Sequence, residues 1–309
     1  MFDQQIHWSS PLPTVHYPAL TRETVVTSPF KRIILATENS EFDAGAERVA
    51  VDLASAYTQP LFAVVPLVTN PEYQIHAPER EEEAEAEASA KLDQFEDSAA
   101  AKGVEVHGMI RLGDEPFREI VEEAKVRKAD LIVIRRRGKR GFLSNLRVGE
   151  MVDAVVSHTD RDVLTVPRTA QVWSRGILLG TDGAPHSERA AEMAMEIALR
   201  CELPLTVVSV AERPEGKGSG EAPAQASVER IVATAVAKGL AAKGRVLTDG
   251  RKPHLAILAA AEETQSDLTV VGRRDLSRLK RLLAGSVSAQ VAGGASGPVL
   301  IVHETPPVF

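Results

Sequence analysis

The 309-residue chain has one cysteine, Cys201, and few aromatic residues, which make up 4% of the sequence. A single cysteine excludes an intramolecular disulfide, a cysteine-rich zinc site and a CxxC redox pair, and it fits a reducing compartment best. No run approaches the roughly 18 apolar residues of a membrane-spanning helix, and the segment from Met1 to Trp8 lacks the basic and apolar regions of a signal peptide. We therefore expect a cytoplasmic protein with an aliphatic core and no membrane partner.

Motifs of several common enzyme classes are also missing. No G-x-x-x-x-G-K-[ST] sequence occurs, which excludes P-loop chemistry, and no G-x-G-x-x-G follows either expected first strand, which weakens a dinucleotide site. His186, His254 and His303 lack metal-ligand spacing, and His158 has no nucleophile in an elbow motif. These patterns predict neither a catalytic residue nor a metal site.

The composition is that of a globular protein with an acidic balance. Hydrophobic residues make up 44% and charged residues 26% of the chain, and 43 acidic against 36 basic residues give a formal net charge of −7. This balance makes nucleic acid an unlikely partner for the whole protein. At about 150 residues per domain, the length favours two domains.

The sequence repeats itself, with the same order of segments in both halves. Three pairs of segments carry the similarity: 32–38 with 176–182, 129–134 with 266–271, and 162–166 with 298–302. Gly113 and Pro116 have counterparts in Gly250 and Pro253, each at the opening of an amphipathic stretch. The repeat predicts two domains, residues 30–168 and 175–303, preceded by an irregular arm, residues 1–29.

Within each half, short aliphatic runs alternate with stretches of apolar period near 3.6, as in buried parallel strands joined by helices. In the second half we expect strands at 176–181, 204–211, 245–248, 267–271 and 298–302, and helices near 186–201, 224–243, 252–264 and 285–293. This alternation predicts doubly wound α/β domains with five-stranded parallel sheets, whose ligands bind outside the carboxyl ends of the strands.

An anion seat is predicted in the second half, where Gly272 to Asp275 follow the fourth strand and Gly285-Ser286 opens a helix. Glycine lets backbone amides approach phosphate oxygens, and a helix N-terminus offers unpaired N–H groups. Here the chain resembles the universal stress protein family, whose nucleotide-binding members carry G-x2-G-x9-G-[ST]. Gly272, Gly285 and Ser286 match this pattern, and Asp275 stands where the second glycine is expected.

The resemblance covers nearly the whole chain in two copies. It implies a tandem protein of two adenine nucleotide alpha hydrolase-like domains, strand order 3-2-1-4-5, in a pseudo-twofold arrangement that pairs the fifth strands, 163–166 and 299–302. It further implies that ATP, ADP or AMP binds the second half, with Asp182 near the nucleoside and Ser209-Val210 along the adenine. The implied site residues are Thr181, Asp182, Val210, Val271, Gly272, Asp275, Gly285, Ser286 and Val287.

Asp275 complicates this site because its carboxylate would face phosphate oxygens. At an effective dielectric of 20, two unit charges 4 Å apart repel by about 4 kcal/mol. Either a Mg²⁺ ion intervenes, the side chain turns to solvent, or affinity suffers. Neighbouring basic residues could offset the repulsion: Arg273, Arg274, Arg278, Lys280 and Arg281.

The first half departs further from the pattern. Arg135 replaces the first glycine, Gly138 keeps the second, and Gly149 follows at a spacing of 149 − 138 = 11 instead of 10. Glu150 stands in place of serine or threonine, where its carboxylate suits a helix N-terminus, and Glu38 takes the place of the acidic nucleoside contact. We therefore expect the first domain to be a structural or partner-binding copy.

Two classes of function remain open, together with plainer roles for single residues. The favoured one is a nucleotide-responsive stress or signalling protein with an unknown protein partner and a possible homodimer. The alternative is a scaffold or chaperone-like interaction protein in which both sites are vestigial. Slow ATP hydrolysis or autophosphorylation on Ser286 comes third, because no residue is placed by spacing alone to activate water. Asp182-Gly183 also fits an ordinary turn, and Ser286 an ordinary helix cap.

Overall fold

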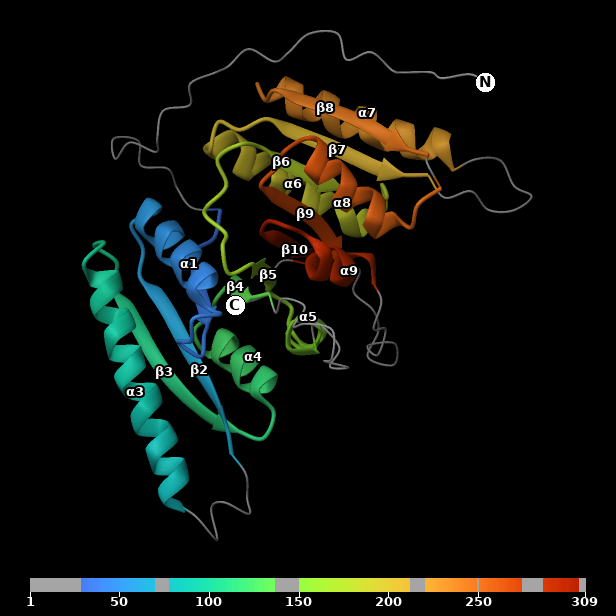
Figure 1. Ribbon diagram of the computed structural model, residues 1–309. Helices are drawn as coiled ribbons and strands as arrows, with labels where there is room; N and C mark the ends of the chain where they lie inside the picture. The colour runs from blue at the N-terminus through green and yellow to red at the C-terminus, as the bar shows by residue number, and fades with distance from the viewer. Residues whose placement is uncertain are drawn as a thin grey trace.

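The computed structural model describes residues 29–69, 78–136, 150–211, 220–248, 250–273 and 286–305. Ten strands of this part of the chain form one sheet, ordered β3-β2-β1-β4-β5-β10-β9-β6-β7-β8 (Figure 1). The strands are β1 Ile33–Ala36, β2 Leu61–Val68, β3 Val106–Gly113, β4 Leu131–Arg135, β5 Asp162–Val166, β6 Ile177–Gly180, β7 Leu205–Val210, β8 Ala242–Leu247, β9 Leu268–Arg273 and β10 Val299–His303. The helices are α1 Ala44–Ala56, α3 Pro78–Ala100, α4 Pro116–Val126, α5 Glu150–His158, α6 Pro185–Arg200, α7 Glu221–Ala237, α8 Pro253–Glu263 and α9 Val287–Gly294.

Each half contributes five parallel strands in the order 3-2-1-4-5, which confirms the predicted fold class. The halves join through their fifth strands: β5 and β10 pair in antiparallel fashion, with Leu164 opposite Leu300. Both leucines are 1% exposed. Because each fifth strand covers the open edge of the other, neither presents unpaired backbone groups to solvent. The expected pseudo-twofold joint between 163–166 and 299–302 is therefore present.

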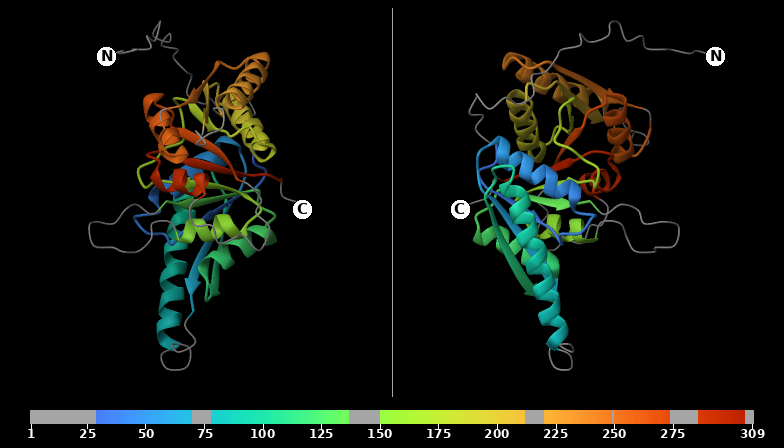
Figure 2. Two further views of the ribbon diagram at one scale, coloured as in Figure 1. Left: turned by 90° about the vertical axis from the view of Figure 1, so that its right-hand side faces the viewer. Right: turned by 60° about the vertical axis from the view of Figure 1, so that its left-hand side comes forward.

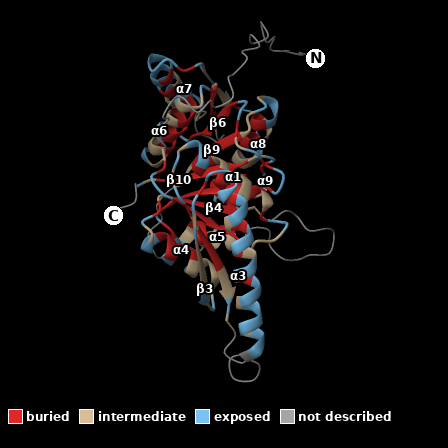
Figure 3. Ribbon diagram, turned by 90° about the vertical axis from the view of Figure 1, so that its left-hand side faces the viewer, coloured by how far each residue is buried: buried red, intermediate tan, exposed pale blue. Residues whose placement is uncertain are grey.

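Helices cover both faces of the sheet. Strand residues alternate between the faces, so that Ile33 and Leu35 belong to the core on the side of α1, α3, α6 and α7, whereas Ile34 belongs to the core on the side of α4, α5, α8 and α9. Buried strands lie at the centre of the three layers (Figure 3). The core is mainly aliphatic, as the scarcity of aromatic residues predicts.

The repeated Ala129-Asp130 and Ser266-Asp267 pairs have a structural reason. Asp130 accepts backbone hydrogen bonds from Lys31 and Arg32, at 2.7 and 3.0 Å, just before β1. Asp267 accepts the equivalent bonds from Arg175 N and Gly176 N, at 3.1 and 3.2 Å, just before β6, and a further one from Ser174 N at 2.8 Å. Each aspartate thus ties the segment entering the first strand of its half to the start of the fourth strand.

One boundary of the second half differs from the prediction. The helix expected to reach residue 243 ends at Ala237, and the following strand begins at Ala242 rather than 245. Gly239 has φ +87°, a conformation that ends a right-handed helix at little cost, and Leu240 N donates to Ala235 O at 3.0 Å. The end of α7 was missed from the sequence because alanine-rich segments flank Gly239.

The acidic segment Glu81–Glu87 lies on α3, which extends away from the second half with mostly exposed side chains (Figures 2 and 3). It is a solvated helix face, as expected. None of the helices within the described residues is long and apolar enough to span a bilayer. The predicted arm, residues 1–29, lies outside the described residues except for Pro29.

Candidate functional site

The site predicted in the second half lies at the carboxyl ends of neighbouring strands. Gly180 of β6 pairs with Val271 of β9. The residues that follow them, Thr181 and Gly272, are therefore equivalent positions at this edge. Both Val271 and Thr181 are buried: Val271 is 3% exposed and belongs to the core, and Thr181 is 7% exposed. Thr181 Oγ1 lies 2.9 Å from Ser187 Oγ at the start of α6 and accepts from Gly183 N at 3.0 Å. This network holds the β6–α6 turn.

Asp182 also takes part in this turn. Its Oδ1 accepts from Ala184 N at 3.0 Å, and its Oδ2 lies 3.1 Å from His186 Nε2. The Asp182 side chain is 50% exposed. The turn role considered from the sequence is therefore real, and the carboxylate remains accessible. Sequence reasoning treated His186 as a scattered histidine and missed this contact, although the spacing i, i+4 at a helix start carries a signal.

Gly272 lies close to the beginning of α6. A Cβ at this position would lie 3.0 Å from His186 O and 3.1 Å from Ser187 Cα. Both neighbours are backbone atoms of one helix, so any side chain at 272 would require α6 to shift. The glycine therefore serves a close approach of β9 to the backbone of α6, and the approach to phosphate oxygens expected from the sequence stays a prediction.

Ser286 is the N-cap of α9, and its hydroxyl accepts from Ala289 N at 3.2 Å. Helix α9 packs on β10 and on β9, the strand that contains Gly272. Val287 is 40% exposed, and Val210 lies half-buried at the end of β7. Asp275 and Gly285 lie outside the described residues, so their predicted places in the site stay predictions.

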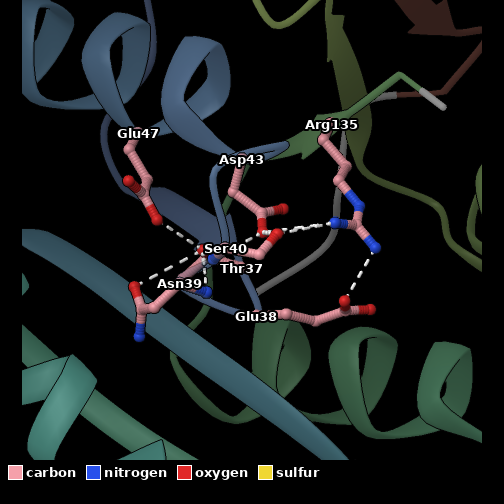
Figure 4. A network of polar contacts seen from close by, with 7 residues as sticks. All are labelled: Thr37, Glu38, Asn39, Ser40, Asp43, Glu47 and Arg135. Atoms are coloured by element: carbon pink, nitrogen blue, oxygen red, sulfur yellow. Dashed lines mark hydrogen bonds and ion pairs between the residues drawn. The ribbon is translucent and has the colours of Figure 1, made fainter. Parts of the chain in front are cut away.

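In the first half, the corresponding pocket is filled by its own side chains (Figure 4). Arg135 stands where Gly272 stands in the second half, since Ala36 pairs with Ile134 as Gly180 pairs with Val271. Its Nη2 lies 2.7 Å from Glu38 Oε2 and its Nη1 lies 3.3 Å from Asp43 Oδ2. Asp43 is 1% exposed, so Arg135 supplies the countercharge that a buried carboxylate needs.

Further hydrogen bonds complete this closed network. Ser40 donates to Asp43 Oδ2 through both N and Oγ, at 3.0 and 2.5 Å, and accepts from Arg135 Nη1 at 3.0 Å. Thr37 Oγ1 donates to Glu47 Oε1 at 2.7 Å. Burial raises the pKa of Glu47, the Thr37 bond opposes that rise, and the negative charge of Asp43 adds to it.

Little room remains beside Arg135. The hollow bordered by Glu38, Pro66, Ile134 and Met151 measures about 30 Å³. One or two water molecules fill such a space, whereas benzene occupies a cavity of about 150 Å³. The described side chains therefore leave room for little more than water in this hollow. Arg137 to Gly149, which include the rest of the basic loop, lie outside the described residues.

The two halves differ by a coupled replacement. Position 43 corresponds to position 187 in the repeat, because each lies seven residues beyond the aligned ends of β1 and β6 (36 + 7 and 180 + 7). The second half therefore has glycine and serine, Gly272 and Ser187, where the first half has an ion pair, Arg135 and Asp43. Sequence reasoning noticed Arg135 but missed Asp43, which the aligned repeat would have revealed.

The fold and the equivalent strand ends define a tandem α/β protein whose two halves carry different residues at the same place, Arg135 with Asp43 in the first and Gly272 with Ser187 in the second. The profile of the Universal stress protein family matches residues 29–167 and 174–303, and the chain belongs to this family. The predicted duplication is thereby confirmed.

Individual relatives agree with this assignment. A universal stress protein of Thermus aquaticus is 36% identical over 135 residues, covering 41% of this chain and 97% of the relative. One of Synechocystis sp. is 24% identical over 171 residues, covering 55% of this chain and only 57% of the relative's length. The crystal structure of a universal stress protein from Archaeoglobus fulgidus has a TM-score of 0.71 at 19% identity, covering 88% of this chain and 96% of that one. This last likeness supports the fold.

Proposed function

We propose that the second domain binds one adenine nucleotide per chain and that the first domain binds none, as a nucleotide-responsive module of the universal stress protein family. The difference between Gly272 and Arg135 carries this proposal. Arg135 occupies its own strand end together with Glu38 and Asp43, whereas Gly272 has no side chain to place there and its backbone lies against the start of α6. A site can bind a ligand only where the protein does not already fill it.

The described residues suit particular parts of such a ligand. The first N–H groups of α9, beyond the Ser286 cap, have no partner within the helix and suit phosphate oxygens. The half-exposed carboxylate of Asp182 suits the hydroxyl groups of a ribose as a hydrogen-bond acceptor. Val210, half-buried at the end of β7, offers apolar surface that suits a purine, whereas Val271 lies in the core beneath the strand end. ATP, ADP and AMP share these features, and Mg²⁺ would relieve the repulsion between Asp275 and the phosphates.

The alternative is a scaffold that binds no nucleotide in either domain. Asp182 favours it in one respect, because both carboxylate oxygens already have partners in the β6–α6 turn. If the second site is vestigial, the second domain binds no ATP, as we propose for the first domain. The two functions therefore differ in a directly measurable property.

The test compares matched substitutions at the two equivalent positions. Gly272→Arg should abolish ATP binding measured by equilibrium dialysis, because the new side chain must displace the start of α6. Arg135→Lys, the control in the other domain, should leave the affinity within twofold. Equal effects of the two substitutions, or no binding by the wild type, would contradict the proposal. Mass spectrometry of nucleotide released from the purified wild type would identify the ligand.

A further inference from the structure

Two polar contacts run from the first domain to helices of the second, in addition to the β5–β10 pairing. Arg136 Nη1 donates to Gly293 O in α9 at 3.1 Å. Asp162 accepts a bidentate pair of hydrogen bonds from Arg189 of α6, at 2.6 and 2.8 Å. Helices α6 and α9 are the two that border the proposed nucleotide site, since α6 begins beside Gly272 and α9 begins at Ser286.

The contact with α9 has a clear electrostatic basis. Gly293 lies in the last turn of α9, whose carbonyl groups lack partners within the helix and carry the negative end of its dipole. A guanidinium donor at this end satisfies one carbonyl and complements the dipole. Arg136 is itself held by the sheet, because its N donates to Val166 O at 2.8 Å. The first domain thus fixes the far end of the helix that begins at the proposed phosphate seat.

The contact with α6 is more deeply buried. Asp162 is 1% exposed and also accepts from His303 N at 3.0 Å, and Arg189 donates to His303 O at 2.8 Å. Arg273 follows Gly272 directly in the chain, and its Nη1 lies 2.9 Å from His303 Nε2. One carboxylate of the first domain therefore connects α6, the end of β10 and the end of β9.

We infer that Arg136 and Asp162 are positioning residues through which the first domain holds the nucleotide site of the second, an inference that rests on the function proposed above. Arg135 and Arg136 are adjacent at the end of β4. The first fills the pocket of its own domain, and the second reaches the site helix of the other. On this view, the first domain binds no nucleotide itself but positions the helices that border the nucleotide site of the second domain.

Arg136→Met tests this directly, because methionine keeps an unbranched apolar chain and removes the donor. We expect ATP affinity, measured by titration calorimetry, to fall roughly tenfold, within the usual range of coupling between sites. Adenosine affinity should stay within twofold, because α9 faces the phosphates. Arg136→Lys should restore part of the loss, since an ammonium group can also donate to Gly293 O. Asp162→Asn should weaken ATP and adenosine alike, because α6 borders the nucleoside.

Arg48→Met is the matched control. Arg48 Nη1 also donates to a backbone carbonyl, Ala170 O at 2.6 Å, but this bond joins α1 to the segment between the domains and includes no residue of α6 or α9. It should leave both affinities unchanged. Hydrogen exchange gives a second readout without ligand: amides of 287–294 should exchange faster in Arg136→Met and at the wild-type rate in Arg48→Met.

The outcomes separate this inference from the proposed function. Wild-type protein that binds no nucleotide would overturn the proposed function and the inference with it. Wild-type protein that binds ATP, with unchanged affinity and exchange in Arg136→Met, would overturn the inference alone. Equal loss of ATP and adenosine binding in Arg136→Met and in Arg48→Met would assign a merely structural role and also overturn it.

Discussion

The two domains share strand order, helix placement and even the aspartate that ties each first strand to each fourth strand, yet they use the same strand-end position in opposite ways. In the first domain Arg135 pairs with buried Asp43 and fills the pocket. In the second, Gly272 and Ser187 occupy these positions and bring the backbone of β9 against α6. The fold is thus independent of the site. A site can be closed by two coupled replacements while the surrounding sheet and helices stay the same.

The joint between the domains should be the most sensitive place in the molecule. Leu164 and Leu300 face each other across β5 and β10, both almost fully buried. Leu164→Asp or Leu300→Asp would bury a charge without a partner and should lower the free energy of unfolding by about 4 kcal/mol or more. Leu164→Ala and Leu300→Ala should each cost about 2 to 5 kcal/mol. Urea unfolding followed by circular dichroism measures these changes.

The pseudo-twofold arrangement makes a stricter demand on the same experiment. The two leucine-to-alanine variants should cost similar amounts, because the two residues are partners in one register. A large effect of one and a neutral effect of the other would show that the domains do not contribute equally to the joint.

The Arg135–Asp43 ion pair of the first domain should contribute more to the free energy of unfolding than the Ser187–Thr181 contact of the second. Asp43→Ala leaves Arg135 with the half-exposed Glu38 as a carboxylate partner and with the Ser40 hydroxyl, and removal of one partner from a buried pair typically costs about 3 kcal/mol or more. Ser187→Ala in the second domain removes a neutral hydroxyl bond to Thr181 and should cost about 1 kcal/mol. Thermal unfolding of both variants tests the difference, and equal costs would count against a buried ion pair in the first domain.

The smallest expected effect concerns Glu47, whose pKa is raised by burial. A carboxyl group with a raised folded-state pKa favours folding below its ordinary pKa, and this contribution is lost as pH rises through the folded-state value. Glu47→Gln keeps an acceptor for Thr37 and should therefore raise the melting temperature slightly at pH 7, with the gain disappearing near pH 4. Glu192→Gln, on an exposed position of α6, serves as the control and should change nothing at either pH.

Local patterns predicted the fold well because the information they need is local. Aliphatic runs such as 267–271 and the order of the repeat sufficed for the strands, whereas the pairing of the fifth strands was expected from the resemblance to the family. The end of α7 was wrong because helix-forming alanines on both sides of Gly239 conceal a backbone of positive φ. Where this helix ends depends on the backbone conformation of Gly239, which cannot be predicted from composition.

The site was predictable only in part. Gly272 and Ser286 carry a spacing that the sequence displays, and Arg135 stands out as a departure from it. Its partner Asp43 lies 92 residues away in the chain, and Arg136 contacts a carbonyl 157 residues away. The aligned repeat points to position 43, but the Arg135–Asp43 ion pair and the Arg136 bond to Gly293 O follow from strand register and helix placement, which the folded chain shows.

The number of ATP molecules bound per chain tests the difference between the domains most directly. Titration calorimetry of the wild-type protein should give one site, because Arg135 and its carboxylate partners occupy the other. Gly272→Arg should reduce the number to none, and Arg135→Lys should leave it at one. Two equivalent sites in the wild type, or a single site that survives Gly272→Arg, would contradict the assignment of nucleotide binding to the second domain.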